Sequence, residues 1–351
     1  MATTTTVPRG AADVDAAWLT TALRTPVAAV RVERVGNGMV ADSLRLHVDY
    51  EQPGAGPATL IAKVPAAGDE SRAAAATTRT YLLEAAFYNE LAASVDVRAP
   101  RCHLSRYDAG TGDYVVLLED VAPAEAGDQL AGCGVDEAAA AIAEMVGLHA
   151  PRWGDRTLEA YEWLDGPSPD SATGVAGLVQ TVWPGFVDRF ASRVEPDVLD
   201  LAGRLVPDLA RHLSWSPRPW TLQHGDFRVD NLLFGGPRVV VVDWQTIRVG
   251  PGVSDLAYFL GASLVPELRR QAEGDLVGEY RRRMAAAGVD LDADDLWAAY
   301  RRAGLGGLVM GIVASMLVSP TERGDLMFLA MVNRHGRQLL DHEAETLMAG
   351  D

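Results

Sequence analysis

Lysine is almost absent from this chain of 351 residues: Lys63 is the only one, and arginine carries every other basic charge apart from histidine. Cysteine is also scarce. Cys102 and Cys133 stand alone, with neither a CxxC pair nor histidines at ligand spacing, which argues against a disulfide framework and against a zinc site. Two isolated thiols fit a reducing compartment, so we predict a cytoplasmic protein.

Long apolar runs are lacking as well. The longest uncharged stretch, Ala303 to Ser319, is just short of a membrane span and contains four glycines, so we predict a buried helix there. The first nine residues lack the apolar core of a signal peptide. The net charge of -17 argues against nucleic acid and against an anionic membrane as partners. The same negative charge is compatible with a small-molecule substrate that is cationic.

The most informative stretch contains H-G-D-x-x-x-x-N, from His224 to Asn231, and then a valine run that ends at Asp243. A Gly-Gly-Pro turn separates two β-branched or aromatic segments, which predicts a hairpin with strands 231–234 and 239–242. Such a hairpin brings the Asn231 amide close to the Asp243 carboxylate. These oxygen donors suit Mg²⁺, which keeps water or phosphate oxygens in its other positions.

Asp226 precedes Asn231 by five residues and can accept the proton of an attacking hydroxyl. Taken alone, a His-Gly-Asp triplet is common in loops, but the whole arrangement resembles the catalytic loop of kinases. Gly225 replaces the Arg of protein kinases, and Asp243-Trp244-Gln245 replaces Asp-Phe-Gly. With these two replacements the motif differs from protein kinases and resembles the superfamily of aminoglycoside phosphotransferases and choline kinases. Within that superfamily it most resembles the ecdysteroid-kinase-like branch.

Lys63 lies in a predicted strand over residues 58–65. A lone lysine inside an apolar strand suggests a need for a compact ammonium group; the alternative is a solvated edge lysine. In the helix predicted over 79–93, Glu84 falls on the apolar stripe and therefore needs a cation. Lys63 is the candidate partner, with Glu90 as the competing carboxylate. The resemblance implies a lysine that holds the ATP phosphates and is oriented by this glutamate.

Two further nucleotide contacts are implied by the resemblance. Gly36, Gly38 and Ser43 would belong to a loop whose backbone covers the phosphates, although Gly-x-Gly could equally be a plain hairpin turn. A hinge near Glu119 and Val121 would bind adenine through its backbone. Backbone hydrogen bonds leave no side-chain pattern, so this assignment depends on the register alone.

Asp255 stands near the start of a predicted helix, where Ser254 or Asp255 is expected as the N-cap. The resemblance implies that Asp255 braces the catalytic loop, and it gives His224 a supporting role in that loop. Arg228 lies two residues after Asp226, where protein kinases carry a lysine that contacts the γ-phosphate. It would neutralise developing charge there, or it is a solvent-exposed arginine.

The resemblance implies an α+β, two-lobed, protein-kinase-like fold, with an N-terminal lobe at 1–118, a hinge and linker at 119–134 and a mainly helical lobe at 135–351. Helices are expected at about 136–150, 174–192, 195–213, 255–286, 293–318 and 322–348. The predicted function is ATP- and Mg-dependent transfer of the γ-phosphoryl group to a hydroxyl of a small molecule, either a secondary metabolite or a lipophilic alcohol. The alternatives are an antibiotic-resistance kinase acting on a cationic, aminoglycoside-like substrate and a pseudokinase that only binds nucleotide.

Overall fold

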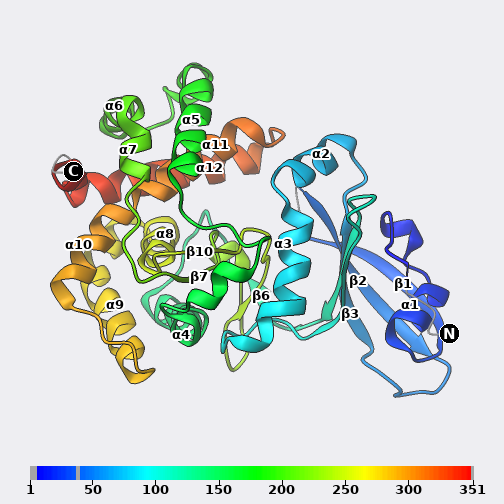
Figure 1. Ribbon diagram of the computed structural model, residues 1–351. Coiled ribbons are helices and arrows are strands. Elements are labelled where there is room, and N and C mark those ends of the chain that lie inside the picture. The colour runs from blue at the N-terminus through cyan, green and yellow to red at the C-terminus, as the bar shows by residue number, and fades with distance from the viewer. Residues whose placement is uncertain (1–5, 37–39, 349–351) are drawn as a thin grey trace. The chain divides into compact units, whose positions relative to one another are not determined.

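The computed structural model describes residues 6–36 and 40–348, and the chain divides into two compact units (Figure 1). The sheet unit comprises Met1–Ser94, Ala99–Pro123 and Val242–Ile247, and the helical unit comprises Val95–Arg98, Ala124–Val241 and Arg248–Asp351. An antiparallel sheet organises the first unit and helices dominate the second. The predicted α+β class is therefore confirmed, while the lobe boundaries at residues 118 and 134 stay a prediction.

The sheet unit is built on five antiparallel strands in the order β1-β2-β3-β5-β4. They are β1 (Val27–Val35), β2 (Ala41–Tyr50), β3 (Thr59–Pro65), β4 (Cys102–Tyr107) and β5 (Tyr114–Glu119). β2 and β3 bury alternate side chains along most of their length, as their sequence predicts. The register sets Ser43 of β2 opposite Lys63 of β3.

Helices cover both faces of this sheet (Figure 1). On one face, α1 (Ala16–Leu23) buries Trp18 and Leu19 in a cluster with the inward-facing residues of β2 and β3. On the other face, α3 (Thr80–Ala86) stacks Tyr81 on Tyr114 of β5, with ring centroids 4.1 Å apart. α2 (Asp69–Thr77) precedes α3. The sheet is thus shielded on both sides, which fixes β3 as a rigid support for its side chains.

The helix predicted over 79–93 is α-helical only as far as Ala86. It continues as a π-helical turn, Phe87–Leu91, and a 3₁₀ turn, Ala92–Ser94. Single π turns inside helices are rare and frequently lie at functional sites. Phe87 opens this turn and stacks on Trp244, with ring centroids 3.8 Å apart.

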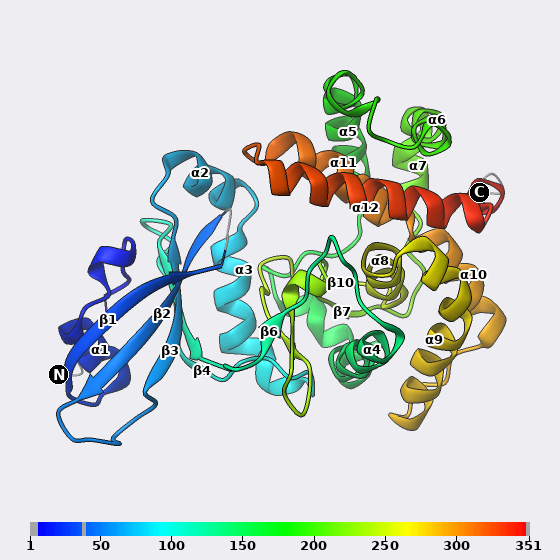
Figure 2. The ribbon, with the colours of Figure 1, turned by 180° about the vertical axis from the view of Figure 1, so that it is seen from behind.

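The helical unit contains ten α-helices among its described residues, and Figure 2 shows α11 and α12 side by side. They are α4 (Val135–His149), α5 (Pro169–Phe190), α6 (Pro196–Leu205), α7 (Leu209–Leu213), α8 (Val253–Ser263), α9 (Pro266–Ala286), α10 (Ala293–Ala303), α11 (Leu305–Leu317), α12 (Glu322–Asp341) and α13 (Ala344–Met348). α5, α6, α11 and α12 share one large hydrophobic core. α11 contains most of the apolar run noted in the sequence and is largely buried, as predicted.

Several helices predicted as continuous are broken in the structure. The predictions affected are 195–213, 255–286, 293–318 and 322–348. Pro266 starts α9, because proline suits the first helical position and forces the preceding residue out of the helix. Gly304 separates α10 from α11, and Glu343, at φ 47°, separates α12 from α13. None of the described helices is long and apolar enough to cross a bilayer.

The predicted hairpin is confirmed, with shorter strands than expected. β8 (Leu232–Phe234) pairs with β9 (Val240–Val241), and Leu232 lies opposite Val241. β6 (Glu125–Ala126) adds a third strand on the other side of β8. A second small sheet joins β7 (Thr221–Gln223) to β10 (Arg248–Gly250). The segment from β7 to β8 is the loop that carries the H-G-D motif.

Candidate active site

The catalytic-loop candidate in the helical unit is centred on Asp226. Its side chain is 18% exposed and accepts hydrogen bonds at both carboxylate oxygens. Tyr258 Oη donates to Oδ1 over 2.6 Å, and Asn231 Nδ2 donates to Oδ2 over 2.9 Å. Arg228 Nε lies 3.1 Å from both oxygens. The loop therefore presents a carboxylate whose orientation is fixed by three neighbouring side chains.

The backbone of this loop is held by a buried carboxylate on α8. Asp255 Oδ2 accepts the N–H of His224 over 2.7 Å, and Oδ1 accepts the N–H of Gly225 over 3.1 Å. His149 Nε2 lies 3.3 Å from Oδ2 of the same group. Burial opposes the charged form, but the hydrogen bond with His149 and the neighbouring imidazoles lower the pKa of Asp255 below its ordinary value.

The expectation that Ser254 or Asp255 caps α8 is wrong. The helix starts at Val253 and its N-cap is Gly252, without a side-chain cap. Asp255 instead uses its oxygens on the catalytic-loop backbone. Such a buried acceptor satisfies backbone N–H groups that would otherwise be costly to bury.

Arg228 is not the solvent-exposed arginine that the sequence left open, since only 13% of its side chain is exposed. Its guanidinium lies between two carboxylates, with Nε on Asp226 and Nη1 2.5 Å from Asp230 Oδ2. Burial alone would lower the pKa of Arg228, but Asp226, Tyr258 and Asp230 raise it above its ordinary value. The loop thus contains a permanent buried cation.

A second charged cluster lies in the sheet unit and is named here the Lys63 triad: Lys63, Glu84 and Asp243. Lys63 Nζ lies 2.6 Å from Glu84 Oε1 and 2.8 Å from Asp243 Oδ1. The expected Lys63–Glu84 ion pair is therefore present, and the solvated-edge alternative for this lysine is wrong. Glu84 is 1% exposed and its Oε2 is 3.4 Å from Tyr114 Oη.

The electrostatics of the Lys63 triad keep the lysine charged. Burial by itself would lower the pKa of Lys63, but the Asp243 and Glu84 carboxylates raise it above its usual value. Burial raises the pKa of Glu84, and the Lys63 ammonium opposes that rise. A carboxylate this deeply buried is tolerated because it has a paired cation.

Asp243 adopts a backbone conformation that is rare for a residue other than glycine, with φ 70°. Such strained positions cluster at functional sites. Its Oδ1 accepts from Lys63, while Oδ2 accepts from Gln245 Nε2 over 3.0 Å. Among the described residues there is no cluster of three or more His, Cys, Asp and Glu side chains able to hold a metal ion. A cation bound here would therefore take some ligands from amides, water or phosphate.

The other predicted nucleotide contacts lie around this sheet. Gly36 has φ 72°, a conformation that favours glycine, and Gly38 lies outside the described residues. Ser43 is in β2 and faces Lys63 in register. Glu119 ends β5 and Val121 follows it. Their roles in nucleotide binding stay predictions.

Sequence reasoning missed two residues of the catalytic loop's surroundings, Tyr258 and Asp230. Tyr258 lies one helical turn after Asp255, so both share the face of α8 that meets the loop. The three-residue spacing from Asp255 could therefore have identified Tyr258 from the sequence. Asp230 Oδ1 also accepts the N–H of Gln129 over 2.8 Å, a contact between segments about a hundred residues apart that no local pattern indicates.

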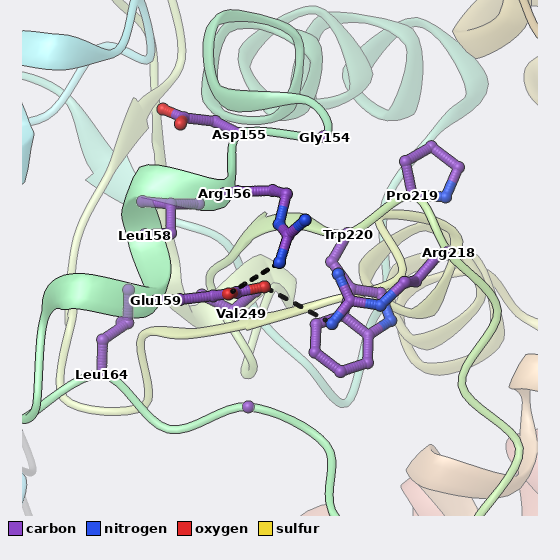
Figure 3. Close-up of a pocket in the computed structure, with 11 residues that line it drawn as sticks. Gly154, Asp155, Arg156, Leu158, Glu159, Leu164, Arg218, Pro219, Trp220 and Val249 are labelled. Atoms are coloured by element: carbon purple, nitrogen blue, oxygen red, sulfur yellow. Dashed lines mark ion pairs between the residues drawn. The ribbon is translucent and has the colours of Figure 1, made fainter.

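A pocket of about 440 Å³ also opens in the helical unit (Figure 3). Glu159 lies between two arginines, 3.7 Å from Arg156 and 3.5 Å from Arg218. The Arg218 guanidinium covers the Trp220 ring at 3.8 Å. Trp220 precedes β7, whereas Asp226 follows it, so a three-residue strand separates this pocket from the catalytic loop.

Comparison with known proteins gives the class of this chain. Residues 40–297 match the phosphotransferase enzyme family, APH, so the chain belongs to that family. The candidate active-site motif from His224 to Asp243 lies inside the matched range. No match was found among curated proteins.

Solved structures share the fold at low sequence identity. A proposed aminoglycoside phosphotransferase from Ralstonia eutropha has a TM-score of 0.58 and 16% identity, covering 94% of this chain and 97% of that chain. A choline kinase from Cryptosporidium parvum has a TM-score of 0.57 and 10% identity, covering 92% and 91%. An aminoglycoside 2'-phosphotransferase bound to GDP has a TM-score of 0.54 and 12% identity, covering 96% and 100%. The chain thus has the kinase-like fold of small-molecule phosphotransferases.

Proposed function

We propose that this protein transfers the γ-phosphoryl group of ATP to a hydroxyl of a small molecule, with Mg²⁺. The observation that carries the proposal is the Lys63 triad: the only lysine of the chain is held between two carboxylates, one of them fully buried. A fixed ammonium of this kind suits the phosphates of a nucleotide. Membership of the phosphotransferase family supports the same chemistry.

In this proposal Asp226 orients the acceptor hydroxyl and accepts its proton. The acceptor oxygen forms a bond to the γ-phosphorus, the bond from that phosphorus to the bridging oxygen breaks, and ADP leaves. Arg228 adds a buried positive charge beside Asp226. His224 supports the loop through its backbone N–H on Asp255.

Asn231 and Asp243 are the proposed ligands of Mg²⁺. Asn231 donates to Asp226 with its amide nitrogen, which leaves its amide oxygen as the donor atom for a cation. Oxygen donors of this kind fit Mg²⁺. When bound, the ion would neutralise charge on the phosphates.

The surroundings of Asp226 favour an acceptor with an apolar skeleton. Tyr258, which donates to Asp226, belongs to an apolar cluster with Met327, Phe328 and Met331. The Met327 sulfur is 3.5 Å from Arg228 Nη1, so this cluster borders the catalytic loop. The four members named are buried, and the partly buried Leu130, Ala314 and Val318 at the edge of the cluster are the residues that a lipophilic alcohol or secondary metabolite would contact. We propose the ecdysteroid-kinase-like branch from the sequence pattern of Gly225 and Asp243-Trp244-Gln245. We also propose that the enzyme acts in the cytoplasm, where ATP is available and the two free cysteines stay reduced.

A cationic amino sugar or amino alcohol is the second candidate acceptor. The formal charge of -17 favours attraction of a cation. The fold neighbours include proteins described as aminoglycoside phosphotransferases and choline kinases. The net charge acts over the whole surface, whereas the apolar cluster borders the loop itself, so the lipophilic acceptor is preferred.

The test is incubation with MgATP and a panel containing kanamycin, choline, a hydroxylated steroid and a long-chain alcohol, with products detected by mass spectrometry. We expect an apolar alcohol to gain one phosphate, and Asp226→Asn to lose most turnover at nearly unchanged ATP affinity. Asp275→Asn, an exposed carboxylate on α9, is the matched control and should stay active. Nucleotide binding without transfer would favour the pseudokinase, and absence of nucleotide binding in calorimetry would refute the kinase function.

A further inference from the structure

Helix α8 delivers two side chains, one turn apart, to the same catalytic loop. Asp255 accepts the backbone N–H groups of His224 and Gly225, and Tyr258 donates its hydroxyl to the Asp226 carboxylate. Residues three apart on a helix lie on one face. Ten of the eleven residues of α8 are buried, which makes it a rigid support.

The Tyr258 ring itself is firmly packed. It is 6% exposed and clusters with Met327, Phe328 and Met331. On another side it lies against the His335 imidazole, with ring centroids 5.4 Å apart. Burial and the nearby carboxylate raise the pKa of Tyr258 well above its ordinary value. The hydroxyl is therefore a permanent donor in a fixed place.

Asp226 needs such a donor because its terminal torsion is soft. The torsion of a carboxylate about its last bond is broad and roughly two-fold, so neighbours decide its angle. Asn231 restrains Oδ2 from within the loop, and Arg228 contacts both oxygens equally at 3.1 Å. Tyr258 donates to Oδ1 alone, over 2.6 Å, and comes from outside the loop. It is the shortest of the hydrogen bonds to this carboxylate.

We propose that Tyr258 is a positioning residue for phosphoryl transfer: its hydroxyl fixes the rotation of the Asp226 carboxylate so that the oxygen facing the acceptor hydroxyl is held in the reactive orientation. This inference rests on the proposed function. Tyr258 acts through Asp226 and does not touch the transferred group. Precise placement matters because small displacements of a catalytic group can reduce rates by about a hundredfold.

Tyr258→Phe is the test variant, because it keeps the packed ring and removes only the hydroxyl. Tyr300→Phe is a matched control. Tyr300 is also buried, and its hydroxyl donates to a carboxylate, Glu273, over 2.9 Å. Gln338 donates to the same hydroxyl over 3.1 Å, so the control removes at least as many hydrogen bonds.

Activity is measured with MgATP and water as acceptor, and with any acceptor identified by the panel. We expect Tyr258→Phe to lower kcat about tenfold with the KM for ATP unchanged, and Tyr300→Phe to leave both within about twofold. In the Asp226→Asn background, adding Tyr258→Phe should cause no further loss, because the two side chains act as one unit. A kcat of Tyr258→Phe within twofold of the wild type, or an equal loss in the Asp226→Asn background, overturns the positioning role.

A second readout needs no turnover. In thermal unfolding without nucleotide, Tyr258→Phe should lower the Tm by a few degrees in the wild-type background and by clearly less beside Asp226→Ala, which removes the oxygen that accepts from Tyr258. Equal falls in both backgrounds contradict this expectation. If wild-type and Tyr300→Phe proteins transfer phosphate and Tyr258→Phe does so equally well, this inference alone fails. If the wild type transfers phosphate to nothing, the proposed function fails and the positioning role falls with it.

Discussion

Replacing Lys63 by Met is the most direct perturbation of the Lys63 triad. Methionine keeps an unbranched apolar stem and removes the ammonium that lies 2.6 Å from Glu84. Removing one partner of a buried ion pair costs about 3–5 kcal/mol, because it leaves an uncompensated charge. Asp243 is 27% exposed and can be hydrated, so only Glu84 is stranded. We therefore expect a loss of unfolding free energy of about 3 kcal/mol at pH 8.

The loss should depend on pH in a defined direction. Burial already raises the pKa of Glu84, and Lys63 opposes that rise, so the variant raises it further. Native Glu84 then binds a proton that the unfolded chain lacks near neutral pH. Stability of the variant relative to wild type should increase as pH falls from 8 toward 6, at no more than about 1.4 kcal/mol per pH unit.

Urea unfolding at pH 8, 7 and 6, followed by tryptophan fluorescence, measures this difference; Trp244 is buried and stacked in the same unit. Arg204→Met is the control, since it breaks an exposed ion pair and should cost less than about 1 kcal/mol. Adding Glu84→Gln to Lys63→Met should restore part of the lost stability at pH 8. A loss for Lys63→Met that stays constant or grows as pH falls would refute the reasoning.

Three further predictions concern the helical unit. Asp255→Asn leaves one accepting oxygen where two hold the loop backbone, so the free energy of unfolding should fall by about 2 kcal/mol in urea and kcat should fall in the ATP assay; an unchanged kcat contradicts the bracing role. Burial lowers the pKa of His335 to about 4 from 6.5. The unfolded state therefore binds a proton that the folded state lacks, and the free energy of unfolding should fall by up to about 3 kcal/mol as pH drops from about 6.5 to 4. In urea unfolding, His335→Gln should lose this part of the pH dependence, and a pH slope equal to that of the wild type would contradict the prediction. Arg228→Lys keeps the charge without the fork that reaches two carboxylates, so kcat should fall about tenfold with little change in the KM for ATP; a rise in that KM instead would indicate phosphate contact.

The local elements were predictable because their signals are short-range. The alternation in β2 and β3 and the turn between β8 and β9 each depend on residues within about ten positions of one another. The Glu84 assignment was predictable for the same reason, since a carboxylate on an apolar helical stripe requires a cation and the chain has one lysine. The breaks at Gly304 and Glu343 were missed because neither residue type forbids a helix.

The sequence by itself determined the class of chemistry: the H-G-D-x-x-x-x-N loop, the Asp after the valine run and the single lysine define a phosphotransferase motif. Only the tertiary structure decided the surroundings of Asp226. The hydrogen bond from Tyr258 to Asp226 depends on how α8 packs against the loop. Arg228 pairs with carboxylates two residues away, but its burial depends on distant segments such as α12, whose Met327 lies 3.5 Å from the guanidinium. Packing of that kind is set by many weak contacts between distant segments, and no short pattern in the chain encodes it.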